Sequence, residues 1–308
     1  KTVRLDSFLR QDYPLFSTGV FNKLLRQNKI KVNDAKPAAT AKLQCGDKIS
    51  LYIEDSYFEK PTKDTAFQFS GRFLDIVYED INILIVNKPA GIPVVDDAWE
   101  NFDTLTNRVI NHYFLLDKQF SFTPCPCHRI DTGTQGLVIF AKSSEALDFI
   151  TLLFKNKQVK KSYLCVVKGV PKSKNSIEKA YLTKKPKEGY VVVSQAKNGE
   201  ASKAIETHLH LLESLDGCSL LEVGLITGKT HQIRAHLAFL NLPILGDSRY
   251  GDNGLNRKLK LKYQLLCSYS IKFGTILQED FKCLHNREFT CPEPWFVDSF
   301  RKNEFSIK

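Results

Sequence analysis

The sequence predicts an α+β protein in which a mixed, mainly antiparallel sheet forms the body and a small basic α/β module precedes it. Short alternating apolar segments recur along residues 73–226, and two pairs of them are joined by turn residues as in β-hairpins. Helical patterns occur singly between these segments, so regular βαβ alternation is not expected. The first 53 residues carry most of the excess positive charge, which marks them off as a separate module.

These sequence patterns divide the chain into three parts. We expect the module at residues 1–54, a linker without clear periodicity at 55–71, and the sheet-containing body at 72–308. The 308 residues and 43% apolar content are ample for a packed core.

The module is expected to contain two helices and two short strands. Ser17 is a candidate cap for the second helix. Lys23 and Arg26 lie three residues apart and therefore share one face of that helix. The predicted elements are helices within 3–9 and 20–30 and strands within 30–34 and 46–53.

The body begins with a hairpin and continues with strands that helices interrupt. Ser144 is a candidate cap for a helix whose apolar face runs from Ala146 to Phe154. The segment 161–170 alternates like a strand, with Tyr163 on one side and Leu164 on the other. The remaining predictions are a hairpin at 73–94, a hairpin at 204–226 with Asp216-Gly217 in its loop, and a helix within 227–240 after a glycine turn.

Composition limits the classes of function. The net charge is +10, and residues 1–53 hold ten Lys or Arg against four Asp or Glu, which favours binding of a polyanion. Charge alone leaves a merely lysine-rich surface equally open. No apolar run approaches the roughly 18–20 residues of a membrane span, and the start of the sequence has no signal-peptide core. We therefore expect a soluble, cytoplasmic monomer without a membrane partner.

Cysteine usage indicates neither a disulfide framework nor a metal site. The eight cysteines are irregularly spaced. Cys125 and Cys127 beside His128 are the nearest approach to a zinc pattern, but no second pair of ligands follows at the usual spacing. We expect no metal.

One short stretch imitates a phosphate-binding loop. The segment "GLITGKT" at 224–230 follows a predicted strand and precedes a helix. A P-loop needs a glycine five residues before Gly228, where this chain has Val223. A nucleotide site is thus disfavoured, though a nucleotide hydrolase stays an alternative.

Two distant segments, "HRID" and "HQIR", carry the strongest candidates for chemistry. Asp131 stands in a polar, glycine-containing segment before a buried strand, and Arg234 stands in the first turns of a helix. A carboxylate beside an arginine is favoured in its ionised form and can act as a nucleophile or a base. From spacing alone, a structural ion pair explains the two residues better.

Four ordered segments resemble the RluA family of RNA pseudouridine synthases. They cover the body from about residue 73 to 300 and read "DINILIVNKPAGIPV", "HRIDTGTQGLVIFAK", "KKSYLCVVKG" and "LITGKTHQIRAHLAFLNLPILGDSRYG". Residues 3–53, with "VRLDSFLRQ", "KIKVND" and "GDKISLYI", are similar to the S4 RNA-binding domain that often precedes that body. The resemblance implies the pseudouridine synthase fold and an S4-like module.

The segments depart from the family pattern at a few positions. Ile130 replaces the usual Leu, Gln135 stands where Ser is common, and Lys229 stands where Arg is common. "VVDD" at 94–97 replaces a frequent Val-His-Pro ending, and Asp34 stands where the S4 turn usually has Gly. Lys229 is the departure that bears on a phosphate contact, because lysine offers a point charge instead of a bidentate fork.

The resemblance assigns roles residue by residue. Asp131 matches the catalytic aspartate, Arg234 the arginine that pairs with it, and Tyr163 the tyrosine that stacks on the uracil. Arg129 matches an arginine that reaches into the RNA once the target base has left its stack. The remaining candidate RNA contacts are His128, Lys229, Lys23 and Arg26.

The implied reaction detaches uracil from C1′ of a uridine and rejoins it through C5, without a cofactor. Asp131 would either attack C1′ or remove a proton from the ribose, and both roles stay open. Ribosomal RNA is the expected substrate because of the S4-like module, with tRNA as an alternative. A non-catalytic RNA-binding or ribosome-assembly protein is the alternative outside the enzymes.

Overall fold

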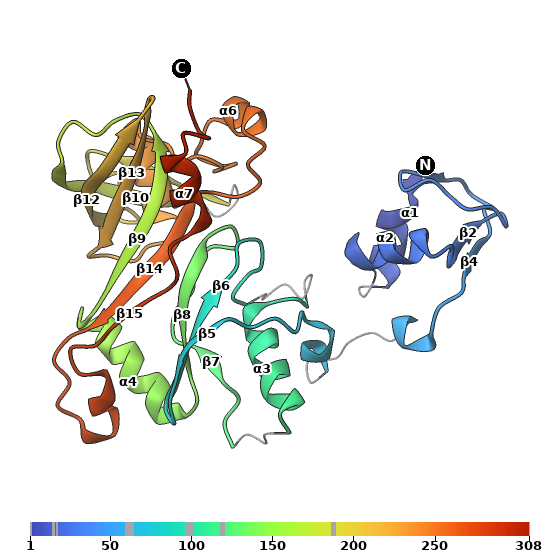
Figure 1. Ribbon diagram of the computed structural model, residues 1–308, viewed down its shortest axis with the longest axis horizontal. Helices are drawn as coiled ribbons and strands as arrows, with labels where there is room; N and C mark the ends of the chain where they lie inside the picture. The colour runs from blue at the N-terminus through green and yellow to red at the C-terminus, as the bar shows by residue number, and fades with distance from the viewer. Residues whose placement is uncertain are drawn as a thin grey trace.

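The computed structural model describes residues 2–13, 16, 18–58, 65–95, 102–117, 121–185 and 189–307. Its first unit packs around its own apolar core, in which helix side chains such as Leu5, Phe21 and Leu24 meet Ile30 and Leu43. Figure 1 shows this unit as a compact group of elements at the blue end of the chain. Its elements are β1 (Val3–Arg4), α1 (Leu5–Asp12), α2 (Thr18–Arg26), β2 (Ile30–Val32), β3 (Lys42–Leu43), β4 (Ile49–Leu51) and the 3-10 turn η1 (Asp55–Phe58).

Both predicted helices and both predicted strands of this unit are present. Strands β2 and β4 pair antiparallel, and β1 and β3 form a second short ladder that the sequence pattern did not reveal. Ser17, the predicted cap, lies outside the described residues. Within the predicted linker the chain forms η1 and η2 (Ala66–Phe69), and Phe67 of η2 packs edge-on against Phe114 of the body at 5.2 Å between ring centroids.

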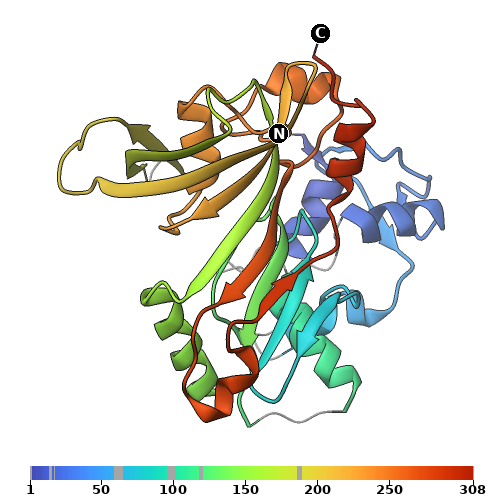
Figure 2. The same cartoon turned by 60° about the vertical axis from the view of Figure 1, so that its left-hand side comes forward.

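The body is built on one eleven-stranded sheet, which twists so strongly that β12 and β13 run at a steep angle to β5 and β6 (Figure 2). The strand order is β11-β10-β12-β13-β9-β14-β8-β6-β5, with β15 paired to β14 and β7 to β8. Among the described residues, β14 and β8 form the one parallel pairing of this sheet. The mixed, mainly antiparallel sheet predicted from the sequence is confirmed. Its strands are β5 (Ile76–Glu79), β6 (Ile83–Lys88), β7 (Cys125–Pro126), β8 (Gln135–Ala141), β9 (Val159–Lys168), β10 (Asn175–Lys185), β11 (Tyr190–Ser194), β12 (Lys203–Leu215), β13 (Cys218–Leu225), β14 (Leu266–Phe273) and β15 (Glu288–Thr290).

Both predicted hairpins are present, as β5–β6 and β12–β13. The second turns through Asp216 and Gly217, whose φ angles of 46° and 84° both lie in the left-handed region that a tight hairpin requires. The β10–β11 hairpin was not predicted from the sequence.

Helices cover the two sides of the sheet. They are α3 (Leu105–Leu115), α4 (Ser144–Lys155), α5 (Gln232–Phe239), α6 (Asn253–Lys258) and α7 (Trp295–Arg301), with a 3-10 segment η4 (Glu279–Leu284). The predicted cap of α4 is wrong by one residue. Ser143 is the cap, since it has the extended backbone that a cap requires and its hydroxyl accepts the Ala146 N–H at 3.1 Å. Ser144 is already the first helical residue.

Strand β9 separates two apolar cores. Its site face, defined by Tyr163, Cys165 and Val167, packs against Ile233 and Leu237 of α5. Its rear face, defined by Leu164 and Val166, faces a larger core that includes the inner sides of α4 and α7 (Figure 1). The alternation predicted for residues 161–170 is therefore confirmed.

Candidate active site

A buried lysine forms hydrogen bonds with the polar segment that precedes β8. Lys88, at the end of β6, is 0% exposed, and its Nζ donates to the carbonyl oxygens of Pro89, Ile92 and Thr132 at 3.0, 2.8 and 3.1 Å. Burial lowers the pKa of Lys88 to about 7, while the negative charge of Asp131 acts in the opposite direction. Lys88 thus joins the turn after β6 to the residue that follows Asp131.

Glycine at position 136 lets the segment enter the sheet. Gly136 has φ +111°, and a Cβ there would collide with the backbone of Ser268 on β14. The close approach allows the short parallel pairing between β8 and β14. Only glycine meets both requirements without strain.

The structure brings Asp131 and Arg234 into direct contact across 103 residues of sequence. Nη1 of Arg234 donates to Oδ2 of Asp131 at 2.7 Å. The same guanidinium donates through Nε and Nη2 to both carboxylate oxygens of Asp247, at 2.7 and 2.9 Å. Arg234 therefore links two carboxylates, of which the sequence reasoning had singled out one.

The two carboxylates differ in their access to solvent. The Asp247 side chain is fully buried, while that of Asp131 is 25% exposed. Asp247 also accepts the backbone N–H groups of Arg249 and Tyr250. Burial alone would raise the pKa of Asp247, but Arg234 and these N–H groups lower it below its usual value. Asp247 is thus fully engaged, and Asp131 is the carboxylate that a substrate can reach.

Arg234 is a permanently charged centre. Burial alone would lower the pKa of Arg234, but its hydrogen bonds and the negative charges of Asp247 and Asp131 raise it above its ordinary value. The guanidinium also lies 5.3 Å from the centroid of the Tyr250 ring. It can therefore orient Asp131 without taking part in proton transfer.

Tyr163 lies on the same face of the sheet as this group. Its side chain is 5% exposed and packs in the apolar cluster that contains Ile233, the neighbour of Arg234. Strand β9 places it opposite Val223 and Ser268. The remaining predicted RNA contacts are distributed elsewhere.

Among the residues predicted to contact RNA, Arg129 and Lys229 are exposed, in line with a surface role. The backbone N–H of Lys229 donates to Oε1 of Gln232 at 3.1 Å, so the protein itself occupies an amide of the P-loop-like segment. His128 is different, because its Nε2 accepts the backbone N–H of Ile139 at 3.2 Å and its ring packs edge-on against Phe154. Burial, followed by the charge of Lys161, lowers the pKa of His128 well below its usual value. These contacts give His128 a structural role, and RNA contact by it stays a prediction.

Lys23 and Arg26 are exposed on α2, while Phe21, Leu24 and Leu25 of that helix are buried. The predicted shared face is therefore directed outward from the first unit.

No described residue belongs to a helix long and apolar enough to cross a membrane.

Sequence reasoning missed four residues around Asp131: Lys88, His231, Asp247 and Tyr250. Asp247 and Tyr250 stand in "GDSRYG", directly after the apolar run Leu242–Leu245. An acidic residue at the end of a buried run was the available signal for Asp247. Lys88 closes the buried strand "ILIVNK" and could have been identified as an internal lysine.

The comparisons with known proteins agree with this geometry. The sequence profile of the family described as RNA pseudouridylate synthase matches residues 82–239, which include Asp131, Tyr163 and Arg234. The chain belongs to this family. It is accordingly an RNA pseudouridine synthase, and the resemblance to the RluA family is confirmed for the body.

Individual relatives extend over most of the chain. An uncharacterized RNA pseudouridine synthase of Mycoplasma genitalium is 31% identical over 291 residues, covering 92% of this chain and 89% of that protein. Ribosomal large subunit pseudouridine synthase C of Rickettsia bellii is 33% identical over 267 residues, covering 82% and 84%. Among solved structures, human RNA pseudouridylate synthase domain containing 4 matches with a TM-score of 0.59 at 23% identity, covering 74% of this chain and 92% of that one. That likeness confirms the fold.

Proposed function

We propose that the enzyme isomerises uridines in ribosomal RNA and that Asp131 is its catalytic carboxylate. The observation that carries the proposal is the asymmetry of the two carboxylates on Arg234. Asp247 is buried and fully hydrogen-bonded, while Asp131 accepts from the same guanidinium and remains 25% exposed. A charged group that is oriented by the protein and still accessible is suited to act on a substrate.

The chemistry requires Asp131 in its ionised form. The C1′–N1 bond of uridine breaks, the uracil turns, and a C1′–C5 bond forms while C5 loses its proton and N1 gains one. Because Arg234 donates to Oδ2, Oδ1 is the oxygen left to attack C1′ or to remove a ribose proton. Uridine and pseudouridine are isomers, so the balanced reaction needs no cofactor.

Tyr163 and Arg129 complete the proposed machinery. Tyr163 offers a ring face for stacking and a hydroxyl that can handle a proton, on the face of the sheet that carries Arg234. Arg129 is exposed two residues before Asp131. From there it can contact RNA and occupy the space that the extruded base leaves. Lys229 would contribute a phosphate contact.

Two features favour ribosomal RNA over tRNA. The relative from Rickettsia bellii carries a ribosomal name and is 33% identical over most of both chains. The first unit, proposed as an S4-like RNA-binding module at residues 1–54, carries ten of the basic residues and exposes Lys23 and Arg26 on α2. Its helix would bind phosphates, which position RNA without reading its sequence.

The test uses Asp131→Asn, which keeps the size of the side chain and removes the ionised group. RNA extracted from cells that lack the gene is incubated with enzyme, and pseudouridine is detected by carbodiimide adducts that stop reverse transcription. We expect a loss of at least about 1,000-fold in rate with unchanged RNA affinity. Asp148→Asn, the same change on the exposed surface of α4, is the control and should leave the rate unchanged.

The experiment separates the two parts of the proposal. Adducts that persist with Asp131→Asn would contradict the role of Asp131. Adducts that appear in tRNA and not in ribosomal RNA would contradict the substrate.

A further inference from the structure

The second oxygen of Asp131 faces a histidine. Arg234 bonds Oδ2, and Nε2 of His231 lies 3.9 Å from Oδ1. This distance is longer than a hydrogen bond, and a carboxylate oxygen that accepts one N–H still keeps a lone pair for the reaction. Catalytic contacts are often long in an enzyme without substrate and shorten in the reacting complex.

The imidazole ring of His231 is anchored from its other side. Its Nδ1 lies 3.0 Å from the hydroxyl of Tyr250, and that hydroxyl accepts the backbone N–H of Val191 on β11 at 2.9 Å. Because the Tyr250 oxygen accepts from Val191, its own O–H can be donated to Nδ1. In that arrangement Nδ1 is the acceptor, and the proton of the neutral ring is on Nε2, facing Asp131.

The backbone supports the same arrangement. His231 caps α5 with φ 53° and ψ 20°, a left-handed conformation that is uncommon outside glycine, although histidine adopts it more readily than most residues. Such conformations persist where the surrounding structure holds them, and they gather at functional sites. In this position His231 precedes Arg234 by three residues, so one turn of chain presents a group to each oxygen of Asp131.

Burial of the imidazole favours its neutral form. Burial lowers the pKa of His231, Arg234 and Arg249 act in the same direction, and Asp131 and Asp247 act against them. The neutral form is the one that donates from Nε2 and accepts at Nδ1.

We propose that His231 is a positioning residue for Asp131: anchored to β11 through Tyr250, it directs an N–H at Oδ1 and holds that oxygen toward the substrate. The inference rests on the proposed role of Asp131. It adds a second orienting contact to the one from Arg234 and makes β11 part of the support of the site.

The test compares His231→Gly and His231→Asn, both of which tolerate the left-handed backbone, with Tyr250→Phe, which removes only the anchoring hydroxyl. Rates and RNA affinities are measured on RNA from cells that lack the gene, and melting temperatures establish that each variant folds. We expect His231→Gly to lower kcat by about 10–100-fold with KM within about threefold, because misplacing a reacting group acts on the rate. His231→Asn should recover part of this loss, since its amide again offers an N–H.

Tyr250→Phe should lower kcat by about 3–10-fold. Since the hydroxyl acts through the imidazole, the double variant His231→Gly/Tyr250→Phe should be no slower than His231→Gly alone. Two independent structural defects would instead multiply. Fully multiplicative losses, or a kcat of His231→Gly within twofold of the unchanged enzyme, would overturn the inference.

Asp131→Asn, measured alongside, distinguishes this failure from failure of the proposed function. If Asp131→Asn is inactive and His231→Gly is fully active, only the role of His231 is wrong. If Asp131→Asn is active, the proposed catalytic role of Asp131 is wrong, and the inference about His231 fails with it.

Discussion

The two faces of β9 both carry apolar side chains, but they contribute differently to the protein. On the rear face, apolar side chains of β9, α4 and α7 pack in a large core. On the site face the core is smaller, and α5 buries Gln232, Arg234 and His236 beside it.

Each of these polar residues on α5 has a partner. Gln232 donates to the Glu206 carbonyl and the Thr207 hydroxyl on β12 at 3.1 Å, and His236 contacts the same hydroxyl at 2.9 Å. Such bonds are directional, whereas apolar packing is not. The comparison indicates that the rear face mainly supplies stability, while the site face also determines where Arg234 points.

The largest effect should come from Arg234→Lys. A lysine cannot bond both oxygens of Asp247 and still reach Asp131, so one of the two carboxylates loses its cationic partner. If the buried Asp247 is the one left unpaired, the loss costs about 3–5 kcal/mol of folding free energy. We expect the rate of pseudouridine formation to fall by about 100–1,000-fold. Urea unfolding and the adduct assay measure the two effects.

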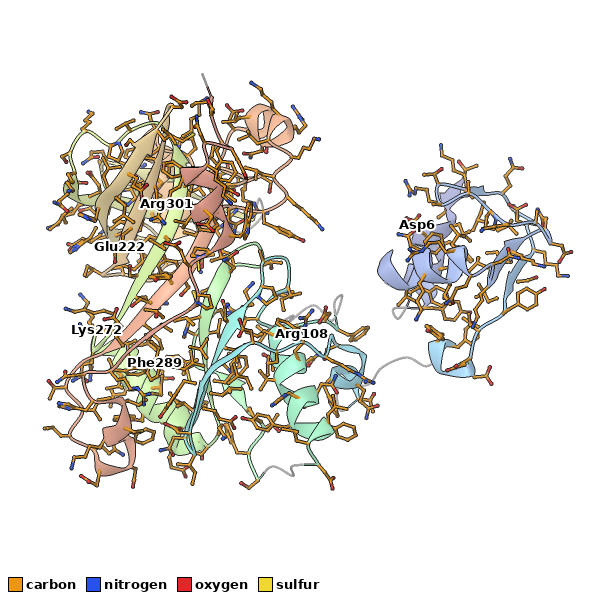
Figure 3. All side chains as sticks on the ribbon, viewed as in Figure 1. Asp6, Arg108, Glu222, Lys272, Phe289 and Arg301 are labelled. Atoms are coloured by element: carbon orange, nitrogen blue, oxygen red, sulfur yellow. The ribbon has the colours of Figure 1, made fainter. Side chains whose placement is uncertain are left out.

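The matched control for Arg234→Lys is Arg301→Lys on α7 (Figure 3). Arg301 pairs with Glu213 and Glu293 at a half-exposed position on α7, the helix that packs over the face of β9 defined by Leu164 and Val166. Exposed pairs contribute about 0–1 kcal/mol, so this change should alter neither stability nor rate by much. Equal losses in the two variants would contradict the distinction between the faces.

A smaller effect, and a direct comparison, comes from two neighbouring leucines of β13. Leu220 and Leu221 are 1% and 0% exposed and point into the rear core and the site-face core, respectively. Each change to alanine should lower the free energy of unfolding by about 3 kcal/mol. At urea concentrations where both variants remain folded, only Leu221→Ala should reduce kcat, because Leu221 packs in the core that supports Tyr163 and α5. Similar rates for the two variants would show that the site tolerates a cavity beneath it.

The smallest of these effects is a pH dependence from Lys88. Its pKa is about 7 in the folded protein and 10.5 as the ordinary value. Between pH 7 and pH 10.5, Lys88 holds a proton in the unfolded chain and lacks it in the folded chain. The free energy of unfolding therefore rises with pH over this range. Below pH 7 the folded protein must bury the charged amine, and the destabilisation has its full value. Relative to Lys88→Met, the unfolding free energy of the unchanged enzyme should increase by about 2 kcal/mol from pH 7 to pH 9. A constant difference over urea titrations at the two pH values would show that Lys88 stays charged when buried.

The sequence was most informative where local pattern and final structure depend on the same residues. The alternation in β9, the Asp216-Gly217 hairpin and the helices of the first unit are set by contacts between near neighbours, and they were predictable. The cap of α4 was misplaced by one residue because Ser143 and Ser144 have the same side chain, and only the backbone angles distinguish them. The β10–β11 hairpin was missed because much of β10 is polar: its exposed Lys179 and Lys184 do not resemble a strand packed on a core.

The sequence by itself determined the family, the mainly antiparallel body and the candidates Asp131, Tyr163 and Arg234. From spacing alone the pair of Asp131 and Arg234 looked like a structural ion pair, and the ordered motifs supplied the argument for chemistry. Only the tertiary structure decided that Arg234 carries a second, buried carboxylate and that a neutral histidine faces the free oxygen of Asp131. Those contacts join residues that lie far apart along the chain, and hydrogen bonding depends on distance and direction in space, which no local sequence pattern records.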